Sequence, residues 1–310
     1  MKKIAIAIHG GAGEDSAFIR EHLAEYEEGL KAALDAGYKV LRAGGTAVEA
    51  VEAAVRSMED NSYFNAGRGS ALNAEGEVEM CTSVMEGKEK RAGAAALVKN
   101  VKNPISFAKS LMESSEGMYV GGPVTVEMAR EIGLELEPDS YFITEHQFDA
   151  FAEERQKHPG KDNSRDPKNF KKHMHGTVGA VAVDKKGNVA AGTSTGGTSF
   201  CLPGRIGDSS MIGVGSYADN QTAAISCTGD GEYLIREVMA GSISATIEHT
   251  QCTVQEACDH VIHVKNKDTK ADLGAIAVDK EGNIGITFNS ERMHRGWKTS
   301  DDEFEVAIYR

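Results

Sequence analysis

The stretch His175-Gly176-Thr177-Val178-Gly179-Ala180-Val181-Ala182 joins two parts of the chain that differ sharply in composition. On its C-terminal side, residues 178–183 form an unbroken apolar run, which predicts a buried strand. On its N-terminal side, residues 153–172 carry eleven charges and two prolines, as is typical of a solvated or flexible segment. We therefore predict a linker over about 145–176 and a strand-rich region that begins at Thr177.

Thr177 is a candidate nucleophile because of this position. A threonine hydroxyl attacks a carbonyl only when a base lies beside it. Cleavage of the bond between Gly176 and Thr177 would free an α-amine with a pKa of about 7.7–8.0, which can act as that base. Gly176 has no side chain to obstruct attack on its carbonyl. The alternative interpretation is an ordinary threonine at the start of a strand.

The strand after Thr177 belongs to a hairpin pattern that occurs twice. Residues 179–188 read GAVAVDKKGN and residues 274–283 read GAIAVDKEGN. Each copy predicts a strand, a turn with a left-handed glycine and a second strand, which is residues 189–195 in the first copy. Helices are expected between the hairpins, over 232–245 and 254–264. This order predicts an α+β fold of two stacked, mainly antiparallel sheets with helices outside.

The N-terminal half contains further patterns. Thr46 and Glu49 form a capping box, which predicts a helix start. Gly10-Gly11-Ala12-Gly13 predicts a tight backbone turn. The other expected elements are a strand at 3–8, helices at 21–41, 46–58, 106–113 and 124–132, a hairpin over 71–85 that turns at 73–76, and a strand at 92–98.

Polar residues on two later segments can support the nucleophile. Thr193, Ser194 and Thr195 lie on the strand expected to pair with the Thr177 strand, so that one hydroxyl can reach it. Residues 228–232, Thr-Gly-Asp-Gly-Glu, end a strand and open a helix. A hydroxyl and backbone N–H groups there can form an oxyanion hole.

A charged pair indicates what such a site could bind. Arg205 and Asp208 lie three residues apart in the sequence Pro-Gly-Arg-Ile-Gly-Asp. A positive and a negative group held together match the carboxylate and the ammonium of an α-amino acid. The alternative is a surface salt bridge, which contributes little to stability.

Other chemistries find weaker support. Residues 192–196 fit the G-x-S-x-G pattern of serine hydrolases, but residues 197–204 cannot form the helix that a nucleophile elbow requires. Residues 10–13 lack the spacing of a nucleotide-binding glycine loop. Two histidine pairs lack a third ligand at metal-binding spacing, so surface or core roles and linker solvation are the better interpretations. They are His260 with His263 and His173 with His175.

The composition excludes several functions. The 310 residues carry 47 acidic and 34 basic side chains, a formal net charge of −13, which argues against nucleic acid or an anionic membrane as a partner. No apolar run approaches the roughly 20 residues of a membrane span, and the first run is shorter than the about 7–15 residues of a secretory signal. The five cysteines are odd in number and form no C-x-x-C motif. We therefore expect a cytoplasmic protein.

Motifs spread along nearly the whole chain carry a family resemblance. They are residues 8–13 (IHGGAG), 64–69 (FNAGRG), 92–94 (AGA), 102–105 (KNPI), 175–182 (HGTVGAVA), 193–197 (TSTGG), 203–208 (PGRIGD), 226–232 (SCTGDGE) and 288–290 (FNS). The chain resembles the isoaspartyl peptidase / plant-type L-asparaginase family of N-terminal nucleophile hydrolases, of the threonine type. Glycosylasparaginases are similar but usually have Asp before the nucleophile, so Gly176 favours the asparaginase branch.

The resemblance implies a four-layer αββα sandwich that is a single domain over residues 1–310. It implies autocleavage between Gly176 and Thr177 into an α chain (1–176) and a β chain (177–310), assembled as an (αβ)2 heterotetramer. It also implies hydrolysis of the β-carboxamide of L-asparagine and of β-aspartyl dipeptides, with release of L-aspartate and no catalytic cofactor. The alternative is a glycosylasparaginase-like or a non-catalytic protein on the same fold.

The same resemblance assigns roles to individual residues. The assignments are Thr177 as nucleophile, Thr195 as its support, Thr228 and Gly229 as oxyanion hole, Arg205 for the substrate α-carboxylate, Asp208 for its α-ammonium, Gly231 lining the ammonium site, and Asn65 as a brace. A structural sodium ion held by main-chain carbonyls is a further expectation. The matching loop residues are Met58, Glu59, Asn61, Phe64, Ala66 and Arg68.

Three departures from the family pattern stand out. Cys81 and Thr82 replace the usual Asp-Ala, and Cys201 replaces a common lysine, so both could alter the pocket rim and the substrate preference. Arg292 replaces an expected glycine and is expected to alter a turn. None of these changes removes a residue of the implied mechanism.

Overall fold

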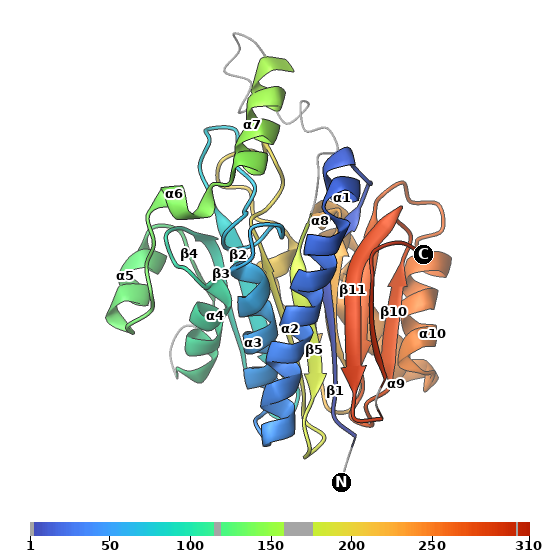
Figure 1. Ribbon diagram of the computed structural model, residues 1–310. Helices are drawn as coiled ribbons and strands as arrows, with labels where there is room; N and C mark the ends of the chain where they lie inside the picture. Colours follow the sequence, from blue (N-terminus) through green and yellow to red (C-terminus); the bar gives the residue numbers. More distant parts are fainter. Residues whose placement is uncertain (1–2, 115–118, 158–175, 302) are drawn as a thin grey trace.

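Two β-sheets form the centre of the computed structural model, which describes residues 3–114, 119–157, 176–301 and 303–310 (Figure 1). The larger sheet has the order β12-β11-β1-β5-β6-β2-β3-β4 and the smaller one β10-β9-β8-β7. In that order the larger sheet contains Phe304–Ala307, Arg292–Thr299, Ala5–Gly13, Val178–Val183, Val189–Thr195, Met80–Glu86, Ala92–Val98 and Tyr119–Gly121. The smaller sheet contains Ile284–Phe288, Leu273–Val278, Ala224–Gly229 and Ser216–Ala218. Among the strands of the described residues, only β3 and β4 pair in parallel, so the predicted α+β class with mainly antiparallel sheets is confirmed.

Each sheet has its own set of helices. The larger sheet contacts α2 (Leu23–Ala43), α3 (Ala47–Glu59) and α4 (Pro104–Glu113). The smaller sheet contacts α8 (Gly231–Glu237), α9 (Met239–Thr250) and α10 (Val254–Asp259), and α10 continues into a π-helical turn, His260–Lys265. The remaining helices are α1 (Ala17–Glu21), α5 (Val124–Glu131), α6 (Asp139–Phe142) and α7 (Glu145–Lys157), with a 3-10 turn at Asp208–Ser210.

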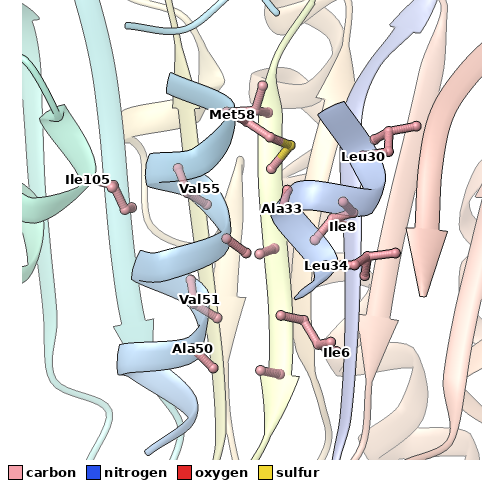
Figure 2. Packing of buried hydrophobic residues seen from close by; sticks show 14 of the residues in the cluster. Ile6, Ile8, Leu30, Ala33, Leu34, Ala50, Val51, Val55, Met58 and Ile105 are labelled. Carbon is pink, nitrogen blue, oxygen red and sulfur yellow. The ribbon is translucent and has the colours of Figure 1, made fainter. Parts of the chain in front are cut away.

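Strand β1 is buried on both faces. Ile6 and Ile8 pack with Leu34 of α2 (Figure 2). The alternating residues Ala5 and Ala7 belong to a separate cluster that also contains residues of β9 in the other sheet. Full burial of one isoleucine side chain contributes about 1.5–3 kcal/mol. Alternate side chains of β1 therefore pack against α2 on one face and against the smaller sheet on the other. This packing fixes the strand that contains Gly10 between the two layers.

The two sides of the Gly176–Thr177 bond are interleaved in the larger sheet. Strand β1 lies between β11 and β5, which both follow Thr177 in the chain. Strand β2 pairs with β6, which also follows Thr177. Three of the ladders in this sheet therefore join the segment before the bond to the segment after it.

Both predicted hairpins are confirmed. In the first, the Asp184 carboxylate accepts hydrogen bonds from the N–H groups of the turn, and Gly187 has a φ of 80°. In the second, Asp279 does the same and Gly282 has a φ of 85°. An aspartate that bonds its own turn and a glycine in the left-handed region explain why the two sequences fold alike.

The predicted hairpin over 71–85 is wrong. The Asn73 side chain accepts from the N–H groups of Glu75 and Glu77 and closes a local turn. The backbone beside it then bonds Phe200 and Cys201 instead of a partner strand. The hairpin that does form joins β2 to β3.

Three other expectations need correction. Residues 10–13 do not turn, because β1 continues to Gly13 through a bulge between His9 and Gly11. The linker predicted from about 145 is wrong for α7, and its remainder, residues 158–175 with the His173/His175 pair, lies outside the described residues. The helix predicted over 232–245 is interrupted at Val238, which adopts a φ of 46° between α8 and α9. Over the described ranges, no helix combines the length and apolarity needed to cross a membrane.

Candidate active site

Thr177 lies where β5 begins, and it is almost fully buried. Residues Val178 and Ser194 are paired across β5 and β6, which brings the next residue of β6, Thr195, to the Gly176–Thr177 bond. The Thr195 hydroxyl donates to the Gly176 carbonyl oxygen at 3.1 Å. The predicted pairing is thus confirmed, and the supporting hydroxyl contacts the carbonyl that self-cleavage would attack.

Glycines pack against this bond from β1. A Cβ on Gly11 would lie 2.8 Å from the Gly176 Cα, and Gly11 has a φ of 112° that disfavours side chains. A Cβ on Gly176 would lie 3.2 Å from the Cβ of Asn65. Both positions therefore leave no room for a side chain beside the bond without a shift of the neighbouring atoms.

Asn65 connects its own loop, which precedes the Gly176–Thr177 bond in the chain, to Gly197, which follows β6. Its side-chain amide donates to the Gly197 carbonyl at 2.7 Å, and its carbonyl accepts from the Ala71 N–H at 2.7 Å. Both ends of the amide are therefore fixed next to Gly176. This placement supports the bracing role assigned to Asn65.

His9 contacts Thr177 directly, although it was not among the site residues expected from the sequence. Its Nδ1 lies 2.8 Å from the Thr177 carbonyl oxygen, which can only accept, so Nδ1 carries the proton. Its Nε2 then accepts from the Ser226 hydroxyl at 2.8 Å, and Ser226 lies 2.8 Å from the Thr193 hydroxyl. A polar side chain that follows the apolar run of β1 was the available sequence signal.

Burial lowers the pKa of His9 to about 4, although its hydrogen bond to Thr177 opposes the shift. Because the folded pKa lies below the ordinary value near 6.5, the unfolded chain binds the proton more readily between these values. The contribution of neutral His9 to the free energy of unfolding is fully present above pH 6.5. It is lost as the pH falls toward 4, at about 1.4 kcal/mol per pH unit. In a Thr177→Ala background, we expect His9→Gln to flatten the fall in unfolding free energy between pH 6.5 and 4.5, measured by denaturant titration. Equal slopes with and without His9 would contradict this assignment.

Thr228 and Gly229 end β8 as expected, and α8 begins at Gly231. The Thr228 hydroxyl accepts from the Ala12 N–H at 3.2 Å, which joins this strand end to β1 beside Gly11. Gly229 has a φ of 133°, and a Cβ there would lie 2.1 Å from the Asp272 carbonyl oxygen. Only glycine fits at this position without a shift of the neighbouring backbone.

Arg205, Asp208 and Gly231 converge. A Cβ on Gly231 would lie 2.8 Å from an Arg205 Nη and 2.9 Å from an Asp208 Oδ. Asp208 is buried. The Arg205 Nε donates to the exposed Glu232 carboxylate at 2.9 Å, and its Nη2 forms a salt bridge with the same oxygen at 2.9 Å. Arg205 and Asp208 therefore do not form an ordinary surface salt bridge, because Asp208 is buried and Gly231, which has no side chain, leaves space between them.

Two of the sequence departures, Cys81 and Thr82, lie inside the protein rather than on a rim. Cys81 pairs with Thr195 across β2 and β6, and Thr82 donates to the Thr193 carbonyl. Burial raises the pKa of the Cys81 thiol, and the Arg205 charge acts against that shift. Cys81 thus lies directly opposite Thr195 on the neighbouring strand.

The remaining departures differ in position. Cys201 is only partly buried, and its carbonyl bonds the Ala74 N–H. Arg292 does not alter a turn as expected. It begins β11 opposite Gly13, and its side chain lines a cavity together with Gly176.

The alternative chemistries are not favoured by the geometry. Ser194 lies within β6, where its hydroxyl donates to the Glu59 carboxyl at 2.7 Å, so it does not occupy a strand-to-helix elbow. His260 and His263 are both exposed on the π-helical turn. In the described part of the chain, no three His, Cys, Asp or Glu side chains form a group that could hold a metal ion.

Two packed sheets with a threonine at the head of a central strand define an α+β protein whose polar residues gather around one peptide bond. Residues 2–308 match the family described as Asparaginase, and the chain belongs to this family. It is 39% identical over 313 residues to the isoaspartyl peptidase of Salmonella typhimurium, with 100% of each chain covered. It is 38% identical over 323 residues to the probable isoaspartyl peptidase/L-asparaginase 2 of Arabidopsis thaliana, with 98% of each covered. It is also 38% identical over 290 residues to the isoaspartyl peptidase/L-asparaginase of Mus musculus, with 94% of this chain and 86% of that one covered.

Proposed function

We propose that this protein is an autoprocessing threonine amidohydrolase of the N-terminal nucleophile type, with a four-layer αββα fold. It cleaves the β-carboxamide of L-asparagine and of β-aspartyl dipeptides and releases L-aspartate. The observation that carries the proposal is the hydrogen bond from Thr195 to the Gly176 carbonyl next to Thr177. Similarity to relatives named isoaspartyl peptidase and L-asparaginase supports the same activity.

Maturation uses the same carbonyl. The Thr177 hydroxyl attacks the Gly176 carbonyl carbon, the bond to the Thr177 nitrogen breaks, and an ester forms as the freed nitrogen takes a proton. Water then hydrolyses the ester, which leaves a carboxylate on Gly176 and restores the Thr177 hydroxyl. The products are an α chain of residues 1–176 and a β chain of residues 177–310, and Thr177 now carries its own base.

The substrate reaction repeats this chemistry on a bound amino acid. Arg205 binds the α-carboxylate and Asp208 the α-ammonium, which directs the β-carbonyl toward Thr177. The Thr177 amine takes the hydroxyl proton and passes it to the leaving amine. Thr228 and the backbone at Gly229 stabilise the oxyanion. The aspartyl ester is then hydrolysed by water.

A structural sodium ion is proposed for the loop between α3 and Gly69. A Cβ on Gly69 would lie 2.6 Å from the carbonyl oxygens of both Ser62 and Phe64, so two carbonyls converge on one point. Carbonyl oxygens are suitable ligands for hard cations. The predicted ligands Met58, Glu59, Asn61, Phe64, Ala66 and Arg68 lie in or beside this loop. Such an ion would have a structural role, because it would hold the loop that carries Asn65 in place.

Further proposals concern the assembly and its location. We propose an (αβ)2 assembly that acts on small molecules. The five cysteines are free thiols, which suits a reducing compartment such as the cytoplasm.

An assay with β-aspartyl-leucine tests the proposed function. Cleaved, purified protein is expected to release aspartate from it, and N-acetylated β-aspartyl-leucine is expected to resist because it lacks the free α-ammonium. If the cleaved protein releases no aspartate, the protein is a non-catalytic relative. Release of an N-acetylglucosamine-linked amine in preference to leucine would favour the glycosylasparaginase alternative.

β-Aspartyl dipeptides are expected to outcompete asparagine in kcat/KM. The preference is expected because relatives are named isoaspartyl peptidase, whereas a site specialised for asparagine would close on the leaving-group side and exclude water. Gly11 and Gly229 do not open that side, because both pack against neighbouring backbone. A difference of about 1.4 kcal/mol in transition-state binding gives a tenfold preference. Both substrates are supplied at equal concentration in one reaction, and faster consumption of asparagine would refute this prediction.

A further inference from the structure

A small cavity beside the Gly176–Thr177 bond is lined by a buried cationic side chain, that of Arg292. The cavity has a volume of about 40 Å³, larger than the roughly 10–15 Å³ that one water molecule requires. Gly176 and Asn65 line it together with Arg292, His294 and Tyr26. It therefore connects the bond that is cut with a group of side chains that the proposed mechanism does not use.

Arg292 is 4% exposed. Its Nε donates to the Glu14 carbonyl at 3.0 Å, and among the described residues no carboxylate forms a salt bridge with it. The nearby Asp15 carboxylate is engaged by Arg20 at 2.6 Å and by the Tyr309 hydroxyl at 3.0 Å. An arginine remains charged when buried, and a buried charge requires a partner. An anion would supply that partner.

His294 provides an independent indication of a ligand. It is 2% exposed, its Nδ1 lies 3.4 Å from the Gly10 carbonyl oxygen, and its Nε2 has no hydrogen-bond partner in the described part of the chain. Burial, followed by the Arg292 charge, holds its pKa well below the ordinary range, whereas the Asp15 charge opposes this shift. An anion beside Arg292 would offset that repulsion, and a protonated Nε2 could then donate to it.

We infer that this cavity binds the carboxylate that self-cleavage creates on Gly176, with Arg292 as its counter-ion. The inference rests on the proposed autocleavage, in which one water molecule is consumed and the peptide bond becomes a Gly176 carboxylate and a Thr177 amine. Gly176 already lines the cavity, so the anion is produced next to its partner. Arg292 thereby keeps the new chain end from returning to Thr195, whose hydroxyl contacts the Gly176 carbonyl before cleavage.

Digestion of the cleaved protein with a carboxypeptidase tests this inference. The α-chain end of the wild type is expected to resist digestion, whereas that of Arg292→Gln is shortened about tenfold faster, as followed by mass spectrometry. Arg292→Lys, which keeps the charge, should fall between them. Arg295→Gln is the matched control, because Arg295 lies on the same strand but donates to the carbonyls of Met293 and Tyr309. Equal digestion rates for wild type and Arg292→Gln would overturn the inference.

Two further measurements make the result unambiguous. A denaturing gel before digestion shows whether cleavage occurred, so failure of the proposed function appears as a single uncut chain. A carboxylate could also come from the second residue of a dipeptide substrate, so kcat/KM is compared for β-aspartyl-leucine and β-aspartyl-leucinamide. Arg292→Gln is expected to change both equally. A loss of about tenfold confined to the acid would assign the cavity to substrate and overturn the inference.

Discussion

The Thr177→Ala variant is expected to remain a single chain of 33.1 kDa and to release no aspartate, whereas the wild type gives two bands. In proportion to residue number, these bands should run at roughly 19 and 14 kDa. Alanine lacks the hydroxyl that attacks the Gly176 carbonyl, so neither the chain nor a substrate can be acylated. Electrophoresis and N-terminal sequencing of the smaller band measure the cut.

A control for this variant is Thr246→Ala. Thr246 lies on α9 and its hydroxyl donates to the Ser242 carbonyl of the same helix, so its loss should leave two bands. Cleavage between residues 176 and 177 in Thr177→Ala would exclude self-processing by that hydroxyl.

Arg205→Gln and Asp208→Asn are expected to lower kcat/KM for β-aspartyl-leucine by about 30-fold to 4,000-fold. Loss of one member of a buried charged contact costs about 2–5 kcal/mol, and each 1.4 kcal/mol is tenfold. Both variants should still cut themselves, because Gly176 within the chain presents neither a free α-carboxylate nor an α-ammonium. Gels and steady-state kinetics on the same preparations measure the two effects.

Arg236→Gln is a suitable control for these variants. Arg236 lies in the last turn of α8, where it is exposed and packs over the Tyr233 ring. Its activity should match the wild type. If Arg205→Gln kept full activity toward β-aspartyl-leucine, the assignment of the substrate carboxylate would be wrong.

Elements whose signals are local were predictable from the sequence. The capping box is present, since the Thr46 hydroxyl accepts from the Glu49 N–H at 3.2 Å while the Glu49 carboxylate accepts from the Thr46 N–H at 2.7 Å. The paired Asp and Gly residues of the two hairpins likewise encode their own turns. In each case the residues that stabilise the structure lie within five positions of one another.

Elements decided by distant contacts were not predictable. Asn73 carries a turn signal, but the residues on either side of it bond residues 200–201, more than a hundred positions away. His9 appears in the sequence as the end of a strand, and its partners Thr177 and Ser226 become evident only from the order of strands. Arg292 had the appearance of a turn residue, and only the fold brings it to the cavity beside Gly176.

The interleaved strands of the larger sheet have a consequence for how the protein can be made. Once the chain is cut after Gly176, β1 still lies between two strands of the other chain and β2 still pairs with a third. The cleaved protein therefore cannot refold as a single chain, because its larger sheet is built from the strands of two chains. Its refolding becomes an encounter of two chains that depends on their concentration, so the uncut precursor is the only form that folds as a unimolecular reaction.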